Sequence, residues 1–361
     1  MLEGQQIPER SSGNVRGSKL RRSSRRMSSA RAELQDRFRA AFLGLAIGDA
    51  LGFPLRGVPP AGLRRLPELA DAFAPKPRGR FPQGQGSDDT ALAVLAAEAI
   101  AEAGAMDGRR FAARLAAAME DGAVVQPARA VAAAAERLAR GVPWMSAGEG
   151  FGVRDASAVS RGLAVGLFEM DGRRVARSAG VLAVVTHKDP TCAAACAAFA
   201  RAVGAVVSGE AASPERLCGA MAASAAEHDP ALAEELRHLP RLLSWEVERA
   251  TELIRRVGVS AASLEEDGGL PEHPWPVLLL GTYAALRLPH DFREAMAAVL
   301  RWGGEADAAA AVAGALLGAG QGEACLPPRL RRHVLGADRL IAAADALLEA
   351  RLARQAHPAA G

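Results

Sequence analysis

Apolar residues recur along this chain with a helical period and almost never alternate with polar ones. Long alanine- and leucine-rich runs, such as residues 91–98 and 308–319, predict helices rather than strands. We expect helices at about 33–47, 88–104, 109–121, 126–140, 158–169, 173–186, 190–208, 214–226, 230–256, 275–287, 291–301, 306–319 and 335–353. The pattern therefore predicts an all-α protein.

Glycine and proline mark where the helical pattern stops. Residues 48–54 contain two glycines and a proline and are expected to end the first helix. Residues 55–86 and 258–274 are predicted loops, and a loop as long as the first is usually functional or disordered. With short connections elsewhere and no internal repeat, we expect one domain at 33–354, with disordered ends at 1–32 and 355–361.

The composition limits how these helices can pack. Half of the residues are apolar (50%), but only 4% are aromatic, and Tyr283 is the single tyrosine. The core must therefore be built from alanine, leucine and valine. Small side chains favour helix formation and let neighbouring helices approach closely.

The formal net charge of +3 comes from the N-terminal end. Residues 1–31 contain eight arginines and lysines but only two acidic residues, so the remaining chain is mildly acidic. This distribution argues against a folded basic surface for nucleic acid. The basic segment has no interleaved aromatic residues and is expected to be a solvated tail. Met27 is an alternative start that would omit most of it.

The four cysteines form no CxxC pair, and no histidine lies at zinc-finger spacing from them. Buried thiols in a reducing compartment are the expected interpretation. No uninterrupted apolar run reaches the roughly 18 residues of a membrane span, and no apolar segment of a secretory signal follows the basic tail. We therefore expect a cytoplasmic protein with no membrane partner.

Two acidic turns open alanine-rich helices and are the strongest candidates for chemistry. Ser87, Asp88 and Asp89 precede one helix, and Glu305 and Asp307 precede another. Each turn alone would ordinarily be a helix cap, but a cap needs one acceptor, and the first turn offers three adjacent oxygen-bearing side chains. Because Mg²⁺ and Mn²⁺ favour converging oxygen ligands, the two turns together indicate a divalent cation site.

Several segments, in order, resemble the ADP-ribosylglycohydrolases, a family that also includes jellyfish J1 crystallins. Residues 44–52 read GLAIGDALG, like the family's opening helix, and 87–90 read SDDT, like its [TS]DDT metal turn. Residues 186–190 read THKDP, like its TH-x-DP element, and 303–308 read GGEADA, similar to its GGDTDT segment. Residues 148–168 resemble its phosphate-side loop, with Arg161 at the arginine. The similarity spans about residues 37–330.

The resemblance implies an orthogonal multi-helix bundle, in a single domain, that holds two divalent cations, Mg²⁺ or Mn²⁺. It implies a metal-dependent hydrolase that removes ADP-ribose from a modified protein, nucleic acid or small molecule. The partner would be the ADP-ribosylated substrate or ADP-ribose itself. Metals would hold the ribose hydroxyls and position a water. Asp88 and Asp89 would be catalytic, and the implied metal ligands are Ser87, Asp88, Asp89, Glu305 and Asp307.

Further residues would support this site. Arg161, Phe53 and Arg56 are candidates for substrate binding, and Phe53 could stack on an adenine or serve local packing. Asp49 could lie behind the metal ligands or order a loop as a buried carboxylate. His187 could likewise support the ligands from behind or cap a helix C-terminus.

Four departures from the family pattern bear on activity. Arg56 stands where the family has a glutamate, and arginine cannot act as a base and adds charge where cations are expected. Glu305 replaces an aspartate, and Ala308 replaces a threonine ligand. Asp155 would repel a diphosphate. The alternative function is therefore a catalytically impaired family member that acts as an ADP-ribose-binding or structural protein. We expect Arg56 to pair with Asp88 or Glu305, or to contact a substrate anion.

Overall fold

The computed structural model describes residues 13–63, 68–74, 81–169, 171–264 and 268–357. Within these ranges the chain forms seventeen α-helices and four short 3-10 helices, and its only β contacts are two isolated bridges. The predicted all-α fold is confirmed.

Many of the helices begin at a side chain that caps them or at a proline, as the sequence pattern predicts. Asp107, Asp171, Asp229 and Asp291 each accept a hydrogen bond from the first turn of the helix that follows. In chain order the helices are α1 (Gly13–Gly52), η1 (Phe53–Leu55), α2 (Pro60–Leu63), α3 (Asp88–Ala103), α4 (Gly108–Glu120), α5 (Arg129–Ala139), α6 (Trp144–Ala147), η2 (Ala156–Ala158), α7 (Gly162–Phe168), α8 (Gly172–Val184), α9 (Pro190–Ser208), α10 (Pro214–Ala225), α11 (Pro230–Leu242), α12 (Val247–Arg256), η3 (Ala261–Ser263), α13 (Pro274–Arg287), α14 (Phe292–Leu300), α15 (Ala306–Gln321), η4 (Glu323–Cys325), α16 (Pro328–His333) and α17 (Ala337–Ala356).

The observed helices differ from the prediction in several places. The helix expected at 230–256 is two helices, α11 and α12, because Pro240 has no N–H to continue the helical ladder and α11 stops two residues later. The short helices α2, α6 and α16 were not predicted, and α2 lies within the expected loop at 55–86. Helix α1 continues to Gly52 instead of ending at residue 47, and it begins at Gly13, inside the expected tail. Residues 1–12 and 358–361 lie outside the described residues, so the predicted domain limits stay a prediction.

Helices α1 and α15 pack backbone against backbone, which explains why α1 does not break at its glycines. A Cβ atom on Gly44 would lie 2.1 Å from the carbonyl oxygen of Gly314, and one on Gly48 would lie 2.1 Å from that of Ala310. Only glycine permits such an approach. The contact runs to the end of α1 and therefore sets it against the start of α15.

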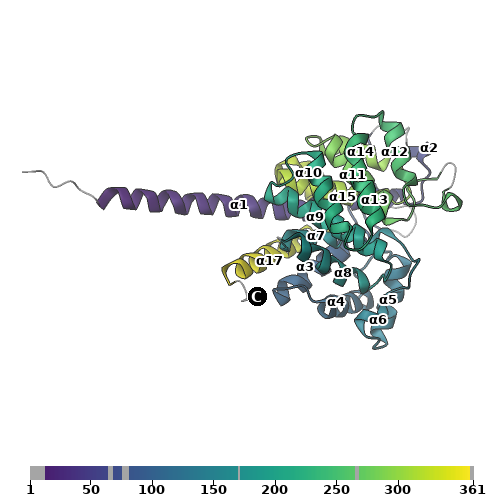
Figure 1. Ribbon diagram of the computed structural model, residues 1–361, viewed down its shortest axis with the longest axis horizontal. Coiled ribbons are helices and arrows are strands. Elements are labelled where there is room, and N and C mark those ends of the chain that lie inside the picture. The colour runs from purple at the N-terminus through teal and green to yellow at the C-terminus, as the bar shows by residue number, and fades with distance from the viewer. Residues whose placement is uncertain (1–12, 64–67, 75–80, 170, 265–267, 358–361) are drawn as a thin grey trace, which may run out of the picture.

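Figure 1 shows α1 as a long rod whose first part extends beyond the bundle. Nearly all of its residues from Phe38 onward are buried inside the fold. The segment Ser28–Leu55 and helix α9 are long and apolar enough to cross a membrane, but most of each is buried inside the fold. Cys192, Cys196 and Cys218 are buried free thiols, as expected for small core residues, whereas Cys325 is only half-buried.

Candidate functional site

The site begins where α1 ends against the first turn of α15. A Cβ atom on Gly52 would lie 2.3 Å from the Cα atom of Asp307, so the two chain segments touch. The η1 turn then reverses the chain and points Arg56 back at this contact. Its Nη2 and Nε atoms lie 2.7 Å and 2.8 Å from Oδ2 of Asp307.

The two acidic turns converge on the same guanidinium group. The Arg56 Nη2 atom lies 3.8 Å from Oδ1 of Asp88 and 4.0 Å from Oε2 of Glu305. Because both turns contact one atom, they lie well within the roughly 10 Å that a shared site allows. Arg56 pairs as expected, but its closest partner is Asp307, which the sequence had not indicated as the partner.

Asp49 holds the first acidic turn in place from behind. Its Oδ2 atom accepts hydrogen bonds from the backbone N–H of Ser87 at 2.9 Å, from that of Thr90 at 3.1 Å and from the Thr90 hydroxyl at 2.5 Å. A Cβ atom on Gly86 would lie 2.8 Å from the same oxygen, so glycine is needed there. Asp49 thus orders the turn that carries Asp88 rather than the loop to Phe53.

Burial is the main influence on the acid–base properties of these carboxyl groups. It raises the pKa of Asp88 to about 7 and that of Glu305 to about 8, although Arg56 opposes both shifts. It also raises the pKa of Asp49 and of Asp89. These four carboxyl groups and that of Asp307 form what we call the acidic cluster. One guanidinium does not neutralise the acidic cluster, which needs protons or a further cation.

Without divalent cations, the free energy of unfolding should fall as the pH rises from about 6.5 to about 8.5. Asp88 and Glu305 titrate near 4 in the unfolded chain, so in this interval the folded protein binds more protons than the unfolded chain. The stability that their protonated forms provide is lost as the pH passes their folded pKa values. Burial lowers the pKa of His273 to about 4, so His273 changes the free energy of unfolding mainly below this pH window.

Urea unfolding in EDTA at several pH values measures this slope. Glu305→Gln should flatten it, because the variant has no proton to lose at that position. A wild-type stability that rises across the window would contradict the expectation.

The residues do not fit the pair of metal ions that the resemblance implies. The Ser87 hydroxyl caps α3 by accepting from the Asp89 N–H at 3.3 Å, and Oδ2 of Asp88 accepts from the Ala128 N–H at 2.8 Å. Ala308 has no oxygen to offer on its side chain. Among the described residues, no group of three histidine, cysteine or acidic side chains is arranged to hold a metal ion.

Two predicted substrate contacts are not available in this structure. Arg161 is fully buried, and its terminal nitrogens donate to the Leu182 and Ser157 carbonyls and to the Thr186 hydroxyl. It therefore holds the 155–158 segment instead of facing a diphosphate. Phe53 is also buried and packs edge-on against Phe81 with ring centroids 5.4 Å apart, so it serves local packing.

His187 and Asp155 form a buried pair beside the cluster. The Nε2 atom of His187 lies 3.0 Å from Oδ2 of Asp155, and its Nδ1 atom lies 2.8 Å from the Thr186 hydroxyl. Burial raises the pKa of Asp155, but hydrogen bonds from His187 and Ser157 outweigh this and lower it. His187 supports a neighbouring loop, and the Asp155 charge that was expected to repel a diphosphate is engaged inside the protein.

Glu272 is a site residue that the sequence did not indicate. The backbone of Leu270 pairs with the second acidic turn, donating to the Gly303 carbonyl at 3.2 Å and accepting from the Glu305 N–H at 3.0 Å. Glu272 thereby lines a cavity of about 300 Å³ together with Gly57 and Gly304, the chain neighbours of Arg56 and Glu305. The only sequence signal was an acidic residue in a predicted loop.

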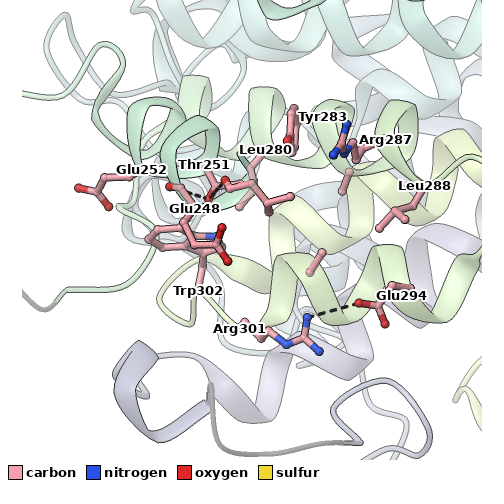
Figure 2. Close-up of a pocket in the computed structure, with 13 residues that line it drawn as sticks. Glu248, Thr251, Glu252, Leu280, Tyr283, Arg287, Leu288, Glu294, Arg301 and Trp302 are labelled. Atoms are coloured by element: carbon pink, nitrogen blue, oxygen red, sulfur yellow. Dashed lines mark hydrogen bonds and ion pairs between the residues drawn. The ribbon is translucent and has the colours of Figure 1, made fainter. Parts of the chain in front are cut away.

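A larger cavity of about 780 Å³ lies elsewhere, between α12, α13 and α14. Figure 2 shows it with Tyr283, Arg287 and Leu288 along one side and Trp302 and Arg301 along the other. No carboxylate of the acidic cluster lines it, so its size does not make it the reaction site.

Comparison with known proteins identifies the family of this chain. The family model for ADP-ribosylglycohydrolase matches residues 30–357 of the chain. This chain belongs to the ADP-ribosylglycohydrolase family. An uncharacterized protein of Archaeoglobus fulgidus is 30% identical over 287 residues, which cover 79% of this chain and 88% of the relative. A solved structure of an ADP-ribosylglycohydrolase-related protein complex has a TM-score of 0.69 at 25% identity and covers 89% of this chain and 99% of its own.

Membership in the ADP-ribosylglycohydrolase family indicates a hydrolase of ADP-ribose linkages, and the family is generally metal-dependent. Arg56 pairs with carboxylates from both of the converging turns.

Proposed function

We propose that this chain binds an ADP-ribosyl group at the acidic cluster and hydrolyses the bond between that group and a protein, nucleic acid or small molecule. The supporting observation is the convergence of Asp88, Glu305 and Asp307 on Arg56, from two turns far apart in sequence. Family membership supports the reaction type.

The accessible part of the cluster is its Arg56–Glu305 face. The side chains of these residues are 22% and 20% exposed, whereas those of Asp88 and Asp307 are 2% and 0% exposed. Arg56 can hold an anionic or hydroxyl-bearing part of a substrate through its free donors, because a guanidinium presents five N–H groups. The Glu272 cavity adjoins this face and offers room for an acceptor.

Hydrolysis of a glycosidic bond needs a group that transfers a proton at the leaving atom or at the attacking water. Position 56 cannot supply it. We assign this role to Glu305, because it is the cluster carboxyl that solvent and substrate can reach. Asp88 and Asp89 are buried behind this face and would help to hold Arg56 in place through their charges. The family is generally metal-dependent, but the described acidic side chains are not arranged to hold Mg²⁺ or Mn²⁺.

Phe151 is the proposed adenine contact in place of Phe53. Its side chain is 82% exposed on a loop between two glycines, and the loop is anchored where the Gly152 N–H donates to Asp189 at 2.8 Å. The same loop continues to Asp155 beside the cluster. An exposed ring on a held loop suits stacking on a base.

A second function is favoured by one specific observation. Arg56 bonds to Asp307 at the position where the family has its glutamate, so an ADP-ribose-binding protein without hydrolysis is the alternative.

Two measurements distinguish the hydrolase from the binding protein. Calorimetry measures ADP-ribose binding, and a release assay measures ADP-ribose freed from a mono-ADP-ribosylated protein and from an ADP-ribosylated DNA end. We expect wild type to do both. Glu305→Gln should lower release at least about 100-fold while changing ADP-ribose affinity little, and Glu294→Gln, on the surface, should change neither. Binding without release would favour the alternative, and absence of both would contradict the proposal.

A further inference from the structure

The cavity between α12, α13 and α14 has no part in the proposed reaction, yet it has the size of a binding site. Its volume of about 780 Å³ lies in the range of small-molecule sites in proteins. Small side chains stand where each of the three helices faces it, namely Thr251, Ala284 and Ala298. The helices therefore leave space between them that no side chain of the cavity wall fills.

Most of the wall of this cavity is apolar. Leu280, Ala284 and Leu288 recur at the spacing of one helix face along α13, and Trp302 lies on the opposite side (Figure 2). The Thr251 hydroxyl donates within α12 to the Val247 carbonyl at 2.7 Å, so it is already partnered. The wall thus suits a ligand with a large apolar body.

One buried polar atom in this wall lacks a partner. Tyr283 is 3% exposed, and its hydroxyl has no hydrogen-bond partner among the described residues. Buried polar groups are almost always hydrogen-bonded, and a buried tyrosine hydroxyl usually finds a partner. Because Tyr283 lines the cavity, a molecule held there can supply the missing partner.

Two opposite charges lie near this hydroxyl. Burial raises the pKa of Tyr283, and the charge of Arg287 lowers it while that of Glu248 raises it. Both charged side chains line the cavity at exposed positions, and neither has an ion-pair partner within 4 Å in the described part of the chain. Arg287 donates one N–H to the Leu243 carbonyl and keeps further donors, because a guanidinium carries five.

The other charged side chains of the wall are paired within the protein. Glu252 pairs with Arg255 at 3.1 Å and with Arg256 at 2.6 Å, and Glu294 pairs with Arg301 at 3.5 Å. The cavity therefore presents one positive and one negative charge to a ligand, on either side of a hydroxyl and above an apolar floor.

We propose that this cavity binds a zwitterion with a large apolar body, of the size of an aromatic amino acid or a dipeptide of apolar residues. The ligand carboxylate pairs with Arg287 and accepts from the Tyr283 hydroxyl, and the ligand ammonium pairs with Glu248. The apolar body packs against Leu280 and Trp302. The site is separate from the acidic cluster, so it does not depend on the proposed hydrolysis.

Calorimetric titration of the full chain near pH 7 tests the proposal, with L-phenylalanine and the dipeptide L-phenylalanyl-L-leucine as probes. At least one probe should bind with a Kd below about 1 mM, and the probe that binds more tightly tells an amino acid site from a peptide site. The N-acetylated form of that probe lacks the ammonium, and its amidated form lacks the carboxylate. Each should bind at least about tenfold more weakly, because each loses a hydrogen-bonded charge.

Three variants test the assigned contacts. Tyr283→Phe removes only the hydroxyl, whereas Glu248→Gln and Arg287→Gln remove charges at exposed positions, where the core is not disturbed. Each should weaken binding of the probe about tenfold. Glu136→Gln is the matched control, since it removes an exposed charge on α5 away from the cavity, and it should keep wild-type affinity.

No binding of either probe at about 10 mM would overturn the proposal. So would acetylated and amidated forms that bind as tightly as the free probe, or wild-type affinity in the Glu248 or Arg287 variant.

Discussion

Replacing Arg56 with methionine is expected to lower the free energy of unfolding by about 3–5 kcal/mol at pH 8 in the absence of divalent cations. Removing one partner of a buried ion pair leaves its counter-charge uncompensated, and such losses are of this order. Here the side chain of Asp307 is fully buried and that of Asp88 nearly so, and Arg56 is the only cation within 4 Å that the described structure gives either of them.

The loss should be smaller at pH 5.5. Asp88 and Glu305, with pKa values raised to about 7 and about 8, are then mostly protonated and need no counter-charge. Urea unfolding at both pH values measures the difference. Arg301→Met removes an exposed ion pair at 3.5 Å and should cost less than about 1 kcal/mol at either pH. Equal losses for Arg56→Met at the two pH values would show that packing, not charge, explains the effect.

Gly48→Val should destabilise the fold by at least about 3 kcal/mol. Its Cβ atom would lie 2.1 Å from the Ala310 oxygen and 2.4 Å from the carbonyl carbon, and backbone cannot move aside as a flexible side chain can. Helices α1 and α15 would have to separate, and overpacking of this kind is costly. The separation would also draw Arg56 away from Asp307.

Gly219→Ala is the control for the Gly48 variant. Gly219 lies within α10, and a Cβ atom there would meet nothing within 4 Å. Alanine is the better helix former, so this change should leave the stability unchanged or raise it by up to about 1 kcal/mol. Urea unfolding compares the two, and a Gly48 variant as stable as the Gly219 variant would contradict the packing of α1 on α15.

Helical period was enough to predict the all-α fold, because apolar spacing is a local property of the sequence. The continuation of α1 through Gly48 was not predictable in the same way. A glycine reads as a helix break unless one knows that another backbone lies against it, and Gly314 and Ala310 are more than 260 residues away.

The candidate site likewise has features that local sequence predicts and features that depend on contacts between distant segments. The acidic turns at Asp88 and Glu305 were recognisable, since each opens a helix with more oxygen groups than a cap needs. The direction of Arg56, the burial of Arg161 and the placement of Glu272 depend on how loops lie over the bundle. Spacing along the chain does not encode those contacts.

The position of bound ADP-ribose tests the account most directly. A crystal of Glu305→Gln grown with ADP-ribose would show the ligand in a difference map. We predict the ligand at the Arg56–Glu305 face beside the Glu272 cavity, with Arg56 still bonded to Oδ2 of Asp307. A ligand in the cavity between α12, α13 and α14, or no ligand at a saturating ADP-ribose concentration, would contradict the account.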